Sequence, residues 1–290
     1  MSIRQAAKST GGWPQQAQIG GETPYPPSIE RAIGPVPGLT ASPLGPFTGV
    51  ASLCPIGAFD SGMGGLSVIA EMRRVLPHED IIYYADNANC PYGGRSDEWL
   101  RGRAMEITDF LMEQGAKAIV VACNTASAAG LEHLRARHSA PIVGLVPAVK
   151  PAVAATRTGR IGVLATKAAM RGQLLADVIE RFAAPEGVEV VTVAPDGLVE
   201  AVERGELHTP ETMETISRAL APMMEKGVDA IVLGCTHFPF LTPAIREVVG
   251  ARVQLIDSSE GVARQTRRVL DAHGLLHHED RVGKIGRAHV

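Results

Sequence analysis

Two cysteines occupy the same place in an internal repeat of the chain. Residues 113–123 (EQGAKAIVVAC) align without gaps on residues 225–235 (EKGVDAIVLGC). Any two helix–strand units of an α/β protein share apolar strands, but that general likeness does not require a cysteine at the same place in both. We therefore expect Cys123 and Cys235 at the carboxyl ends of equivalent strands in two similar lobes, the end at which ligands bind in open parallel sheets.

Two thiols that face each other across an interlobe cleft could move a proton from one face of a carbon centre to the other. One thiolate would remove the α-hydrogen of an amino acid while the other thiol donates a proton from behind. A free thiol has a pKa of about 8.5, so the site must favour the thiolate on the attacking side. A helix N-terminus next to each cysteine would favour its thiolate through the helix dipole and the free N–H groups. A racemase or epimerase of this kind needs no cofactor.

Polar residues follow both cysteines and could bind a substrate. Asn124 and Thr125 come directly after the first cysteine, and Thr236 and His237 come directly after the second. Their side chains, with the backbone N–H groups of a helix N-terminus, could hold an α-carboxylate and an ammonium group.

Two loops could complete the site. Residues 60–65 (DSGMGG) follow the first predicted strand and open a helix. Their glycines either let backbone amides point into a cleft as an anion site or only allow a tight strand–helix turn. Residues 86–95 (DNANCPYGGR) form a polar loop with Tyr92 and Gly93 that could close over a ligand.

Other roles for the cysteines are weaker. A free cysteine often only packs in a core, but the repeat and the polar neighbours argue against that interpretation here. Zinc could be held by Cys123, Cys235 and His237, although no paired C-x2-C spacing supports it. A disulfide would abolish the chemistry and does not suit a reducing compartment. We expect no metal and no cofactor.

Short apolar runs alternate with helical periods from residue 56 onward, which predicts an α/β fold with mainly parallel sheets. Strands are expected at 56–60, 81–86, 118–123, 141–146, 160–165, 188–193, 229–235 and 252–257. Helices are expected near 66–76, 97–114, 127–137, 168–182, 211–226 and 259–273. Gly115 and Gly227 each lie between the end of a predicted helix and the next predicted strand, a position at which glycine commonly caps a helix C-terminus.

Composition excludes several classes of protein. The 290 residues carry 28 basic and 31 acidic side chains, a net charge of −3, so no cationic field favours nucleic acid or anionic lipid. No apolar run reaches the roughly 18–20 residues that span a bilayer, and the N-terminus lacks a secretory pattern. Four scattered cysteines do not form a disulfide framework, which favours a cytoplasmic protein.

The two ends of the chain differ from the rest. Residues 1–54 are rich in proline and glycine, and we expect a disordered leader; a start codon placed too far upstream or a regulatory arm are the alternatives. Residues 281–290 are expected to be a non-native tail, because IGRAHV resembles a translated sequencing adapter, with the true C-terminus missing.

Five ordered motifs resemble those of the bacterial glutamate racemases in the aspartate/glutamate racemase superfamily. The likeness covers about residues 56–276. The motifs are 59–67 (FDSGMGGLS), Ala85-Asp86 followed by 91–93 (PYG), 122–126 (ACNTA), Val202-Glu203 with Gly205, and 233–239 (LGCTHFP).

This resemblance implies a cofactor-independent interconversion of L- and D-glutamate that supplies D-glutamate for peptidoglycan. By position, Cys123 would act on D-glutamate and Cys235 on L-glutamate. Asp60 would support the first thiol and His237 the second, with Glu203 as an auxiliary carboxylate. The substrate-binding residues would be Asp60, Ser61, Tyr92, Gly93, Asn124, Thr125, Thr236 and His237.

The resemblance also implies two pseudo-symmetric flavodoxin-like lobes with the active site in the cleft between them, and a homodimer. The first lobe would comprise 55–148 plus the C-terminal segment 257–280, and the second 149–256. His237 favours glutamate, since aspartate racemases usually have glutamate after the second Cys-Thr. Cys90 and Glu200 depart from the family's pattern, and Glu200 lies close enough to Glu203 to leave open which carboxylate assists.

Three rival functions stay open. A related cofactor-free enzyme would act on aspartate, a hydantoin or a malonate. A racemase that uses pyridoxal phosphate would need a Schiff-base lysine, but Lys150 and Lys167 stand in no recognisable setting for one. A non-catalytic protein that binds an amino acid or a protein partner could use the same scaffold.

Overall fold

Two parallel sheets organise the chain, for which a computed structural model describes residues 51–278 and 281–289. The first sheet has the order β4-β3-β1-β2-β9 and the second the order β6-β5-β7-β8. The strands of the first sheet are β1 (Ile56–Asp60), β2 (Ile81–Ala85), β3 (Ala118–Val121), β4 (Ile142–Gly144) and β9 (Ile285–His289). Those of the second are β5 (Arg160–Ala165), β6 (Glu189–Val193), β7 (Ala230–Gly234) and β8 (Gln254–Ile256).

The two sheets repeat one topology, as the aligned segments of the sequence predict. Strands β1 to β4 of the first sheet correspond in order and position to β5 to β8 of the second. The register agrees as well, because Ile56 pairs with Ala118 between β1 and β3, and Ile161 pairs with Ala230 between β5 and β7. The order 2-1-3-4 is that of a flavodoxin-like sheet, so the α/β fold class with parallel sheets is confirmed.

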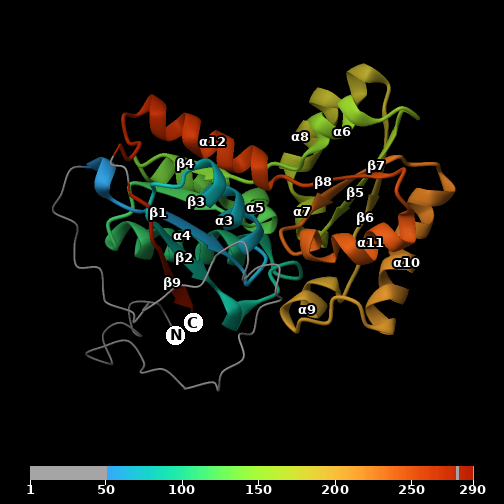
Figure 1. Ribbon diagram of the computed structural model, residues 1–290, viewed down its shortest axis with the longest axis horizontal. Helices are drawn as coiled ribbons and strands as arrows, with labels where there is room; N and C mark the ends of the chain where they lie inside the picture. The colour runs from blue at the N-terminus through green and yellow to red at the C-terminus, as the bar shows by residue number, and fades with distance from the viewer. Residues whose placement is uncertain (1–50, 279–280, 290) are drawn as a thin grey trace.

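Helices cover these sheets. Those near the first sheet are α3 (Leu66–Val75), α4 (Asp97–Glu113), α5 (Asn124–Arg137) and α12 (Ser259–Ala272). Those near the second are α6 (Val149–Ala155), α7 (Lys167–Arg171), α8 (Gln173–Phe182), α9 (Leu198–Glu203), α10 (Pro210–Glu225) and α11 (Thr242–Val249). We call each sheet with its helices a lobe, and Figure 1 shows the first lobe on the left and the second on the right.

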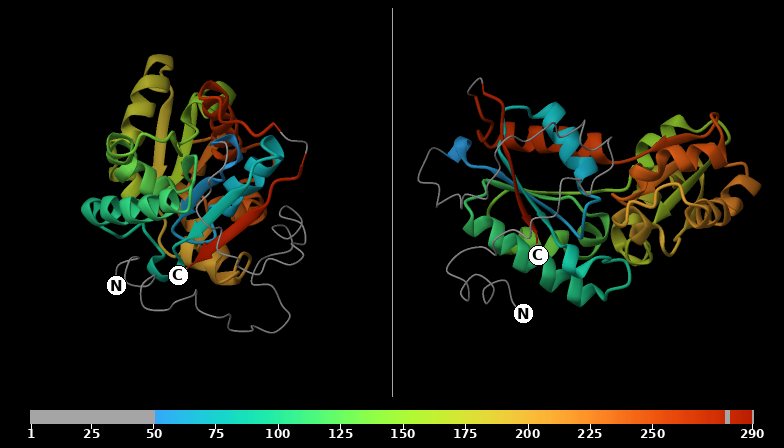
Figure 2. Two further views of the ribbon diagram at one scale, coloured as in Figure 1. Left: turned by 90° about the vertical axis from the view of Figure 1, so that its left-hand side faces the viewer. Right: turned by 60° about the horizontal axis from the view of Figure 1, so that its bottom comes forward.

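The first lobe is closed by a helix from the far end of the chain. Helix α12 follows β8 of the second lobe and returns to pack against α3. Figure 2 (right) shows α3 and α12 on one face of the first sheet, with α4 and α5 on the other. Every residue of β1, β3 and β4 is buried and all but Asp60 are apolar, as expected for a parallel sheet covered on both faces.

Local signals set several helix ends. Ser96 caps α4 by accepting the N–H of Trp99 with its side chain, and Thr209 caps α10 through the N–H of Thr212. Beyond the C-termini of these two helices, Gly115 and Gly227 have φ of 83° and 71°. Residues with a Cβ rarely adopt this left-handed conformation, so the predicted glycine caps are confirmed.

Several elements differ from the sequence predictions. The helix expected at 168–182 is two helices, α7 and α8, which meet at Gly172. There the chain turns against α5, and a Cβ on Gly172 would lie 2.8 Å from that of Ala128. Helices α6, α9 and α11 were not expected, because each is short and lacks a full apolar period.

The two ends of the chain were expected to be a disordered leader and a non-native tail. The predicted leader lies outside the described residues except for its last four, of which Ala51–Leu53 form a 3₁₀ turn. Part of the segment 281–290, which was expected to be a non-native tail, forms strand β9. This strand pairs in parallel with β2, from Ile81 opposite Ile285 to Ala85 opposite His289.

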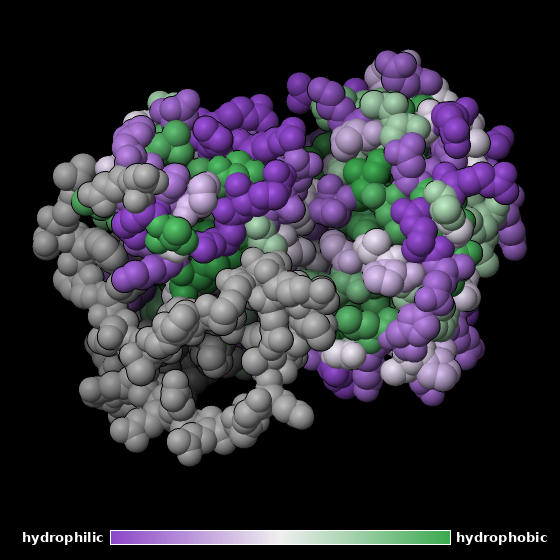
Figure 3. Space-filling model, in the orientation of Figure 1, coloured by the Kyte–Doolittle hydropathy of each residue, from purple (hydrophilic) through white to green (hydrophobic). Residues whose placement is uncertain are grey.

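The surface in Figure 3 is mostly hydrophilic over both lobes, with smaller apolar patches between, and a furrow marks the boundary of the lobes at the top of the view. Within the described ranges, no helix has the length and apolar character needed to cross a bilayer.

Candidate active site

Both cysteines of the repeat lie just beyond equivalent strands and line one small cavity. Cys123 follows β3 and stands at the N-cap position of α5, as predicted. Cys235 follows β7, but the element after it is a 3₁₀ helix, Phe238–Leu241, rather than the expected α-helix N-terminus. The cavity is lined by Ser61, Pro91, Tyr92, Gly93, Cys123, Asn124, Thr125, Thr166, Val199, Cys235, Thr236 and His237.

The cavity is closed in this structure. Cys123 and Cys235 are only 4% and 5% exposed. The free space is about 10 Å³, which is room for about one water molecule. The lobes or their loops must therefore part before anything as large as an amino acid can enter.

Asp60 at the end of β1 supports Cys123. Its carboxyl group is fully buried, accepts the backbone N–H of Gly65 at 2.5 Å and the hydroxyl of Thr236 at 3.1 Å, and contacts the thiol of Cys123. Burial raises the pKa of Asp60 above its usual value. Burial and the nearby Asp60 carboxylate raise the pKa of Cys123 well above that of a free thiol. Both raised pKa values favour the protonated forms of Cys123 and Asp60.

His237 connects Cys235 to Glu203 on the other side of the cavity. Its Nδ1 lies 3.8 Å from Sγ of Cys235, and its Nε2 lies 2.6 Å from Oε1 of Glu203. Burial alone would lower the pKa of His237, but contacts with Cys235, Cys90 and Glu203 raise it well above the usual value. Burial likewise opposes ionisation of Glu203, yet the His237 contact holds its pKa below normal. Both pKa shifts favour an ion pair between the imidazolium of His237 and the carboxylate of Glu203.

The glycine-rich loop after β1 makes room for this ion pair. Glu203 on α9 accepts the backbone N–H of Met63 at 2.7 Å, a contact between the lobes. A Cβ on Gly62 would overlap the Glu203 carboxylate, and a Cβ on Gly64 would overlap the His237 ring. These glycines therefore allow close approach of the second lobe, in addition to the tight turn that the sequence suggested.

Among the predicted substrate-binding residues, Asn124 carries the clearest signal of a ligand. Its side chain is buried, lines the cavity, and its Nδ2 has no hydrogen-bond partner within the described part of the chain. An orphaned buried donor of this kind needs an explanation, and an acceptor on a bound ligand supplies one. Ser61 and Thr236 line the same cavity, but both hydroxyl groups already bond Asp60.

The remaining predicted residues are partly engaged by the protein. Thr125 shares a 2.8 Å hydrogen bond with Thr166 of the second lobe. The hydroxyl of Tyr92 donates to Asp86 at 2.5 Å, and burial with that contact raises the pKa of Tyr92. Gly93 faces Thr166, whose Cβ would lie 3.2 Å from a Cβ at the glycine.

Some residues of the site were not found from the sequence. Thr166 and Val199 line the cavity from the second lobe. Asp86 is fully buried and accepts two hydrogen bonds from Arg103, at 2.6 and 2.7 Å, which fixes the loop that carries Tyr92. Asp86 belongs to a motif of the sequence analysis, but nothing along the chain indicated its contact with Arg103 or the approach of Thr166 and Val199, which depend on the fold.

Cys90 lies beside the ion pair and could share a metal ion with it. One donor atom from each of Cys90, Glu203 and His237 lies within 4.8 Å of the others. Glu200, the alternative carboxylate, is not part of this group.

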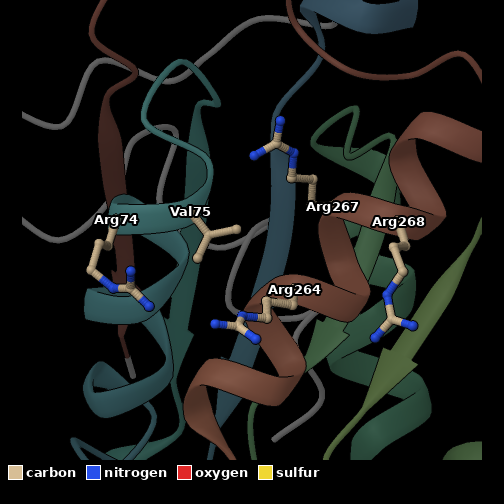
Figure 4. A pocket seen from close by; sticks show the side chains of 5 residues that line it. All are labelled: Arg74, Val75, Arg264, Arg267 and Arg268. Carbon is tan, nitrogen blue, oxygen red and sulfur yellow. The ribbon is translucent and has the colours of Figure 1, made fainter.

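A larger hollow of about 540 Å³ lies between α3 and α12, away from the two thiols. It is lined by Val75 and by Arg74, Arg264, Arg267 and Arg268. Figure 4 shows that the guanidinium groups point in different directions, and Glu260 already pairs with Arg74 and Arg264. The arginines therefore do not converge on a ligand.

Fold and site together define a class of protein: two repeated α/β lobes, each of which contributes one buried thiol to a shared cavity. The sequence model described as Asp/Glu/Hydantoin racemase matches residues 64–266, and the chain belongs to that family.

Relatives and solved structures support this assignment. The chain is 53% identical over 234 residues to a glutamate racemase of Deinococcus radiodurans, and the aligned residues make up 81% of each of the two proteins. It is similar to the crystal structure of Escherichia coli glutamate racemase in complex with L-glutamate and the activator UDP-MurNAc-Ala, with 36% identity, a TM-score of 0.69, and coverage of 75% and 83%. It is also similar to the Francisella tularensis glutamate racemase in complex with D-glutamate, with 28% identity, a TM-score of 0.72, and coverage of 82% and 88%.

Proposed function

We propose that this chain interconverts L- and D-glutamate by transferring protons between Cys123, Cys235 and the substrate's α-carbon, without a cofactor. One observation carries the proposal: two buried thiols from equivalent strand ends line the same cavity. The choice of glutamate rests on the relatives, which are glutamate racemases, two of them solved with L- or D-glutamate.

The two sides of the site suit two opposite steps. In one direction, the thiolate of Cys235 takes the α-proton of L-glutamate, and the thiol of Cys123 gives its own proton to the opposite face. The raised pKa of Cys123 keeps that proton in place until it is needed. In the other direction, Cys123 takes the proton of D-glutamate and Cys235 returns one.

The neighbouring groups reset the thiols after each turnover. Protonated His237 stabilises negative charge on Cys235 and is itself held by Glu203. Asp60, whose pKa burial raises, exchanges a proton with Cys123 through their direct contact. The arrangement places an acid–base partner behind each thiol.

The α-carbanion also needs stabilisation. We assign the substrate's α-carboxylate to the orphaned amide of Asn124, because charge on the carboxylate grows as the α-proton leaves. Closure of the two lobes over the bound substrate would exclude bulk water and strengthen this interaction. Ser61, Tyr92, Gly93, Thr125 and Thr236 complete the proposed substrate site.

The wider role follows from the product. D-glutamate from this reaction would supply peptidoglycan synthesis in the cytoplasm, where free thiols such as Cys123 and Cys235 persist. A homodimer is the expected assembly, and light scattering on the purified chain tests it.

The test uses the full chain without added cofactor. L-glutamate and D-glutamate are incubated separately, and circular dichroism follows the loss of optical activity. We expect both samples to reach the same racemic mixture, while L-aspartate keeps its signal. Racemisation of aspartate instead, or no change with a folded sample, would contradict the proposal.

A further inference from the structure

Cys90, Glu203 and His237 bring three different donor groups together at the interlobe boundary. One donor atom from each lies within 4.8 Å of the other two. Cys90 belongs to the loop that precedes α4 in the first lobe, while Glu203 ends α9 and His237 follows β7 in the second. His237 is buried and the other two are half-buried, so the cluster is shielded but reachable.

This donor set suits a borderline divalent ion. Zn²⁺ is bound by cysteine sulfur at about 2.3 Å and by histidine nitrogen or carboxylate oxygen at about 2.0–2.2 Å. Those lengths place tetrahedral ligands about 3.5 Å apart, so a contraction of at most about 1.3 Å would bring the widest pair of donor atoms to the distance between two ligands of one ion. The 2.6 Å contact between Glu203 and His237 would open as the ion enters between them. A water molecule would complete four ligands.

We propose that Cys90, Glu203 and His237 form an inhibitory Zn²⁺ site, a regulation that rests on the proposed function. Binding would release the thiol proton of Cys90 and the imidazolium proton of His237 to solvent. The ion would then hold Nε2 of His237 and a carboxylate oxygen of Glu203.

Inhibition has two physical causes. His237 with its Nε2 on a metal cannot carry the positive charge that it places beside Cys235, because that charge requires protons on both ring nitrogens. The ion would also link a residue of the first lobe to two of the second. The cavity has room for about one water in this closed arrangement, so a link that holds the lobes together keeps the substrate out.

The test begins with full-length protein freed of metal by a chelator. Zn²⁺ is titrated against the initial rate of L-glutamate racemisation in the wild type, Cys90→Ser, and the control Cys54→Ser, which changes another half-buried free thiol. We expect inhibition of the wild type and of Cys54→Ser that the chelator reverses. Loss of one ligand in Cys90→Ser should raise the Zn²⁺ concentration for half-inhibition at least about tenfold.

A second readout does not depend on activity. Co²⁺ bound to a thiolate gives a sulfur-to-metal absorption band, which we expect in the wild type, Cys54→Ser and Cys235→Ser but not in Cys90→Ser. A band that survives in Cys90→Ser, or equal Zn²⁺ inhibition of Cys90→Ser and wild type, would overturn the site. A protein with no racemase activity in the absence of metal would contradict the proposed function, while the Co²⁺ spectra would still decide the metal site.

Discussion

Gly64 of the first lobe lies directly against the imidazole of His237 of the second, so close that a Cβ at the glycine would overlap the ring. The adjoining Met63 donates its backbone N–H to Glu203, the partner of that histidine. The turn after β1 thus sets the place of an ion pair from the opposite lobe. Placement of His237 is therefore a property of how the lobes dock, as well as of its own strand.

This contact predicts a selective defect for Gly64→Ala. The added methyl would push His237 away from Cys235, so we expect kcat/KM for glutamate to fall by about 10²-fold, in line with a small displacement of a catalytic group. Gly94→Ala is the matched control, because nothing lies within 4 Å of a Cβ at that glycine. Equal activity of the two variants would contradict the role of the close approach.

Each thiol is expected to be indispensable. Cys123→Ala and Cys235→Ala should each lower racemisation by at least the 10²- to 10⁴-fold that a positioned acid or base contributes, with the fold intact by circular dichroism. Cys54→Ala, which lies outside the cavity, should keep the wild-type rate. Substantial turnover by either single variant would contradict the two-base mechanism.

Asn124→Ala tests the proposed carboxylate contact. A hydrogen bond to a charged group is worth about 1.5–3 kcal/mol, so kcat/KM should fall about 10- to 100-fold. The free energy of unfolding in denaturant should fall only slightly, because the buried Nδ2 has no hydrogen-bond partner to lose in the free protein. A large loss of stability with unchanged kinetics would give Asn124 a structural role instead.

Glu203→Gln is expected to change the pH dependence. The Glu203 carboxylate helps to raise the pKa of His237, so its removal lowers that pKa and His237 loses its proton at a lower pH. Because protonated His237 is the form that stabilises the Cys235 thiolate in the proposed mechanism, the alkaline limb of kcat/KM against pH should move to lower pH. Glu200→Gln, on the same helix, is the control and should leave the limb in place. A shift toward higher pH would contradict the assignment.

The repeat in the sequence predicted the fold well, because it indicates which strands of the two lobes are equivalent as well as where the strands and helices lie. Aligned apolar runs place Cys123 and Cys235 beyond equivalent strands, and the structure pairs those strands identically in both lobes. Strand β9 could not be predicted in the same way. Its sequence, IGRAH, lacks an apolar run, and β2 recruits it through backbone pairing at the sheet edge.

Long-range contacts between polar groups were also beyond the sequence. Cys90 meets Glu203 and His237 only because the lobes dock, and no spacing along the chain encodes that meeting. The same is true of the pair Thr125 and Thr166 across the cleft. The sequence motifs identified the side chains that could react, whereas the docking of the two lobes determines which neighbours shift the pKa values of those side chains.

The most direct test of two-base catalysis is the fate of the α-hydrogen in D2O. L-glutamate is converted to a few per cent, and mass spectrometry measures deuterium separately in the product and in the recovered substrate. If Cys235 removes the proton and Cys123 delivers another from the opposite face, the D-glutamate carries deuterium while the recovered L-glutamate keeps protium. Deuterium that enters the recovered substrate as fast as the product would show a single exchanging base and contradict the account.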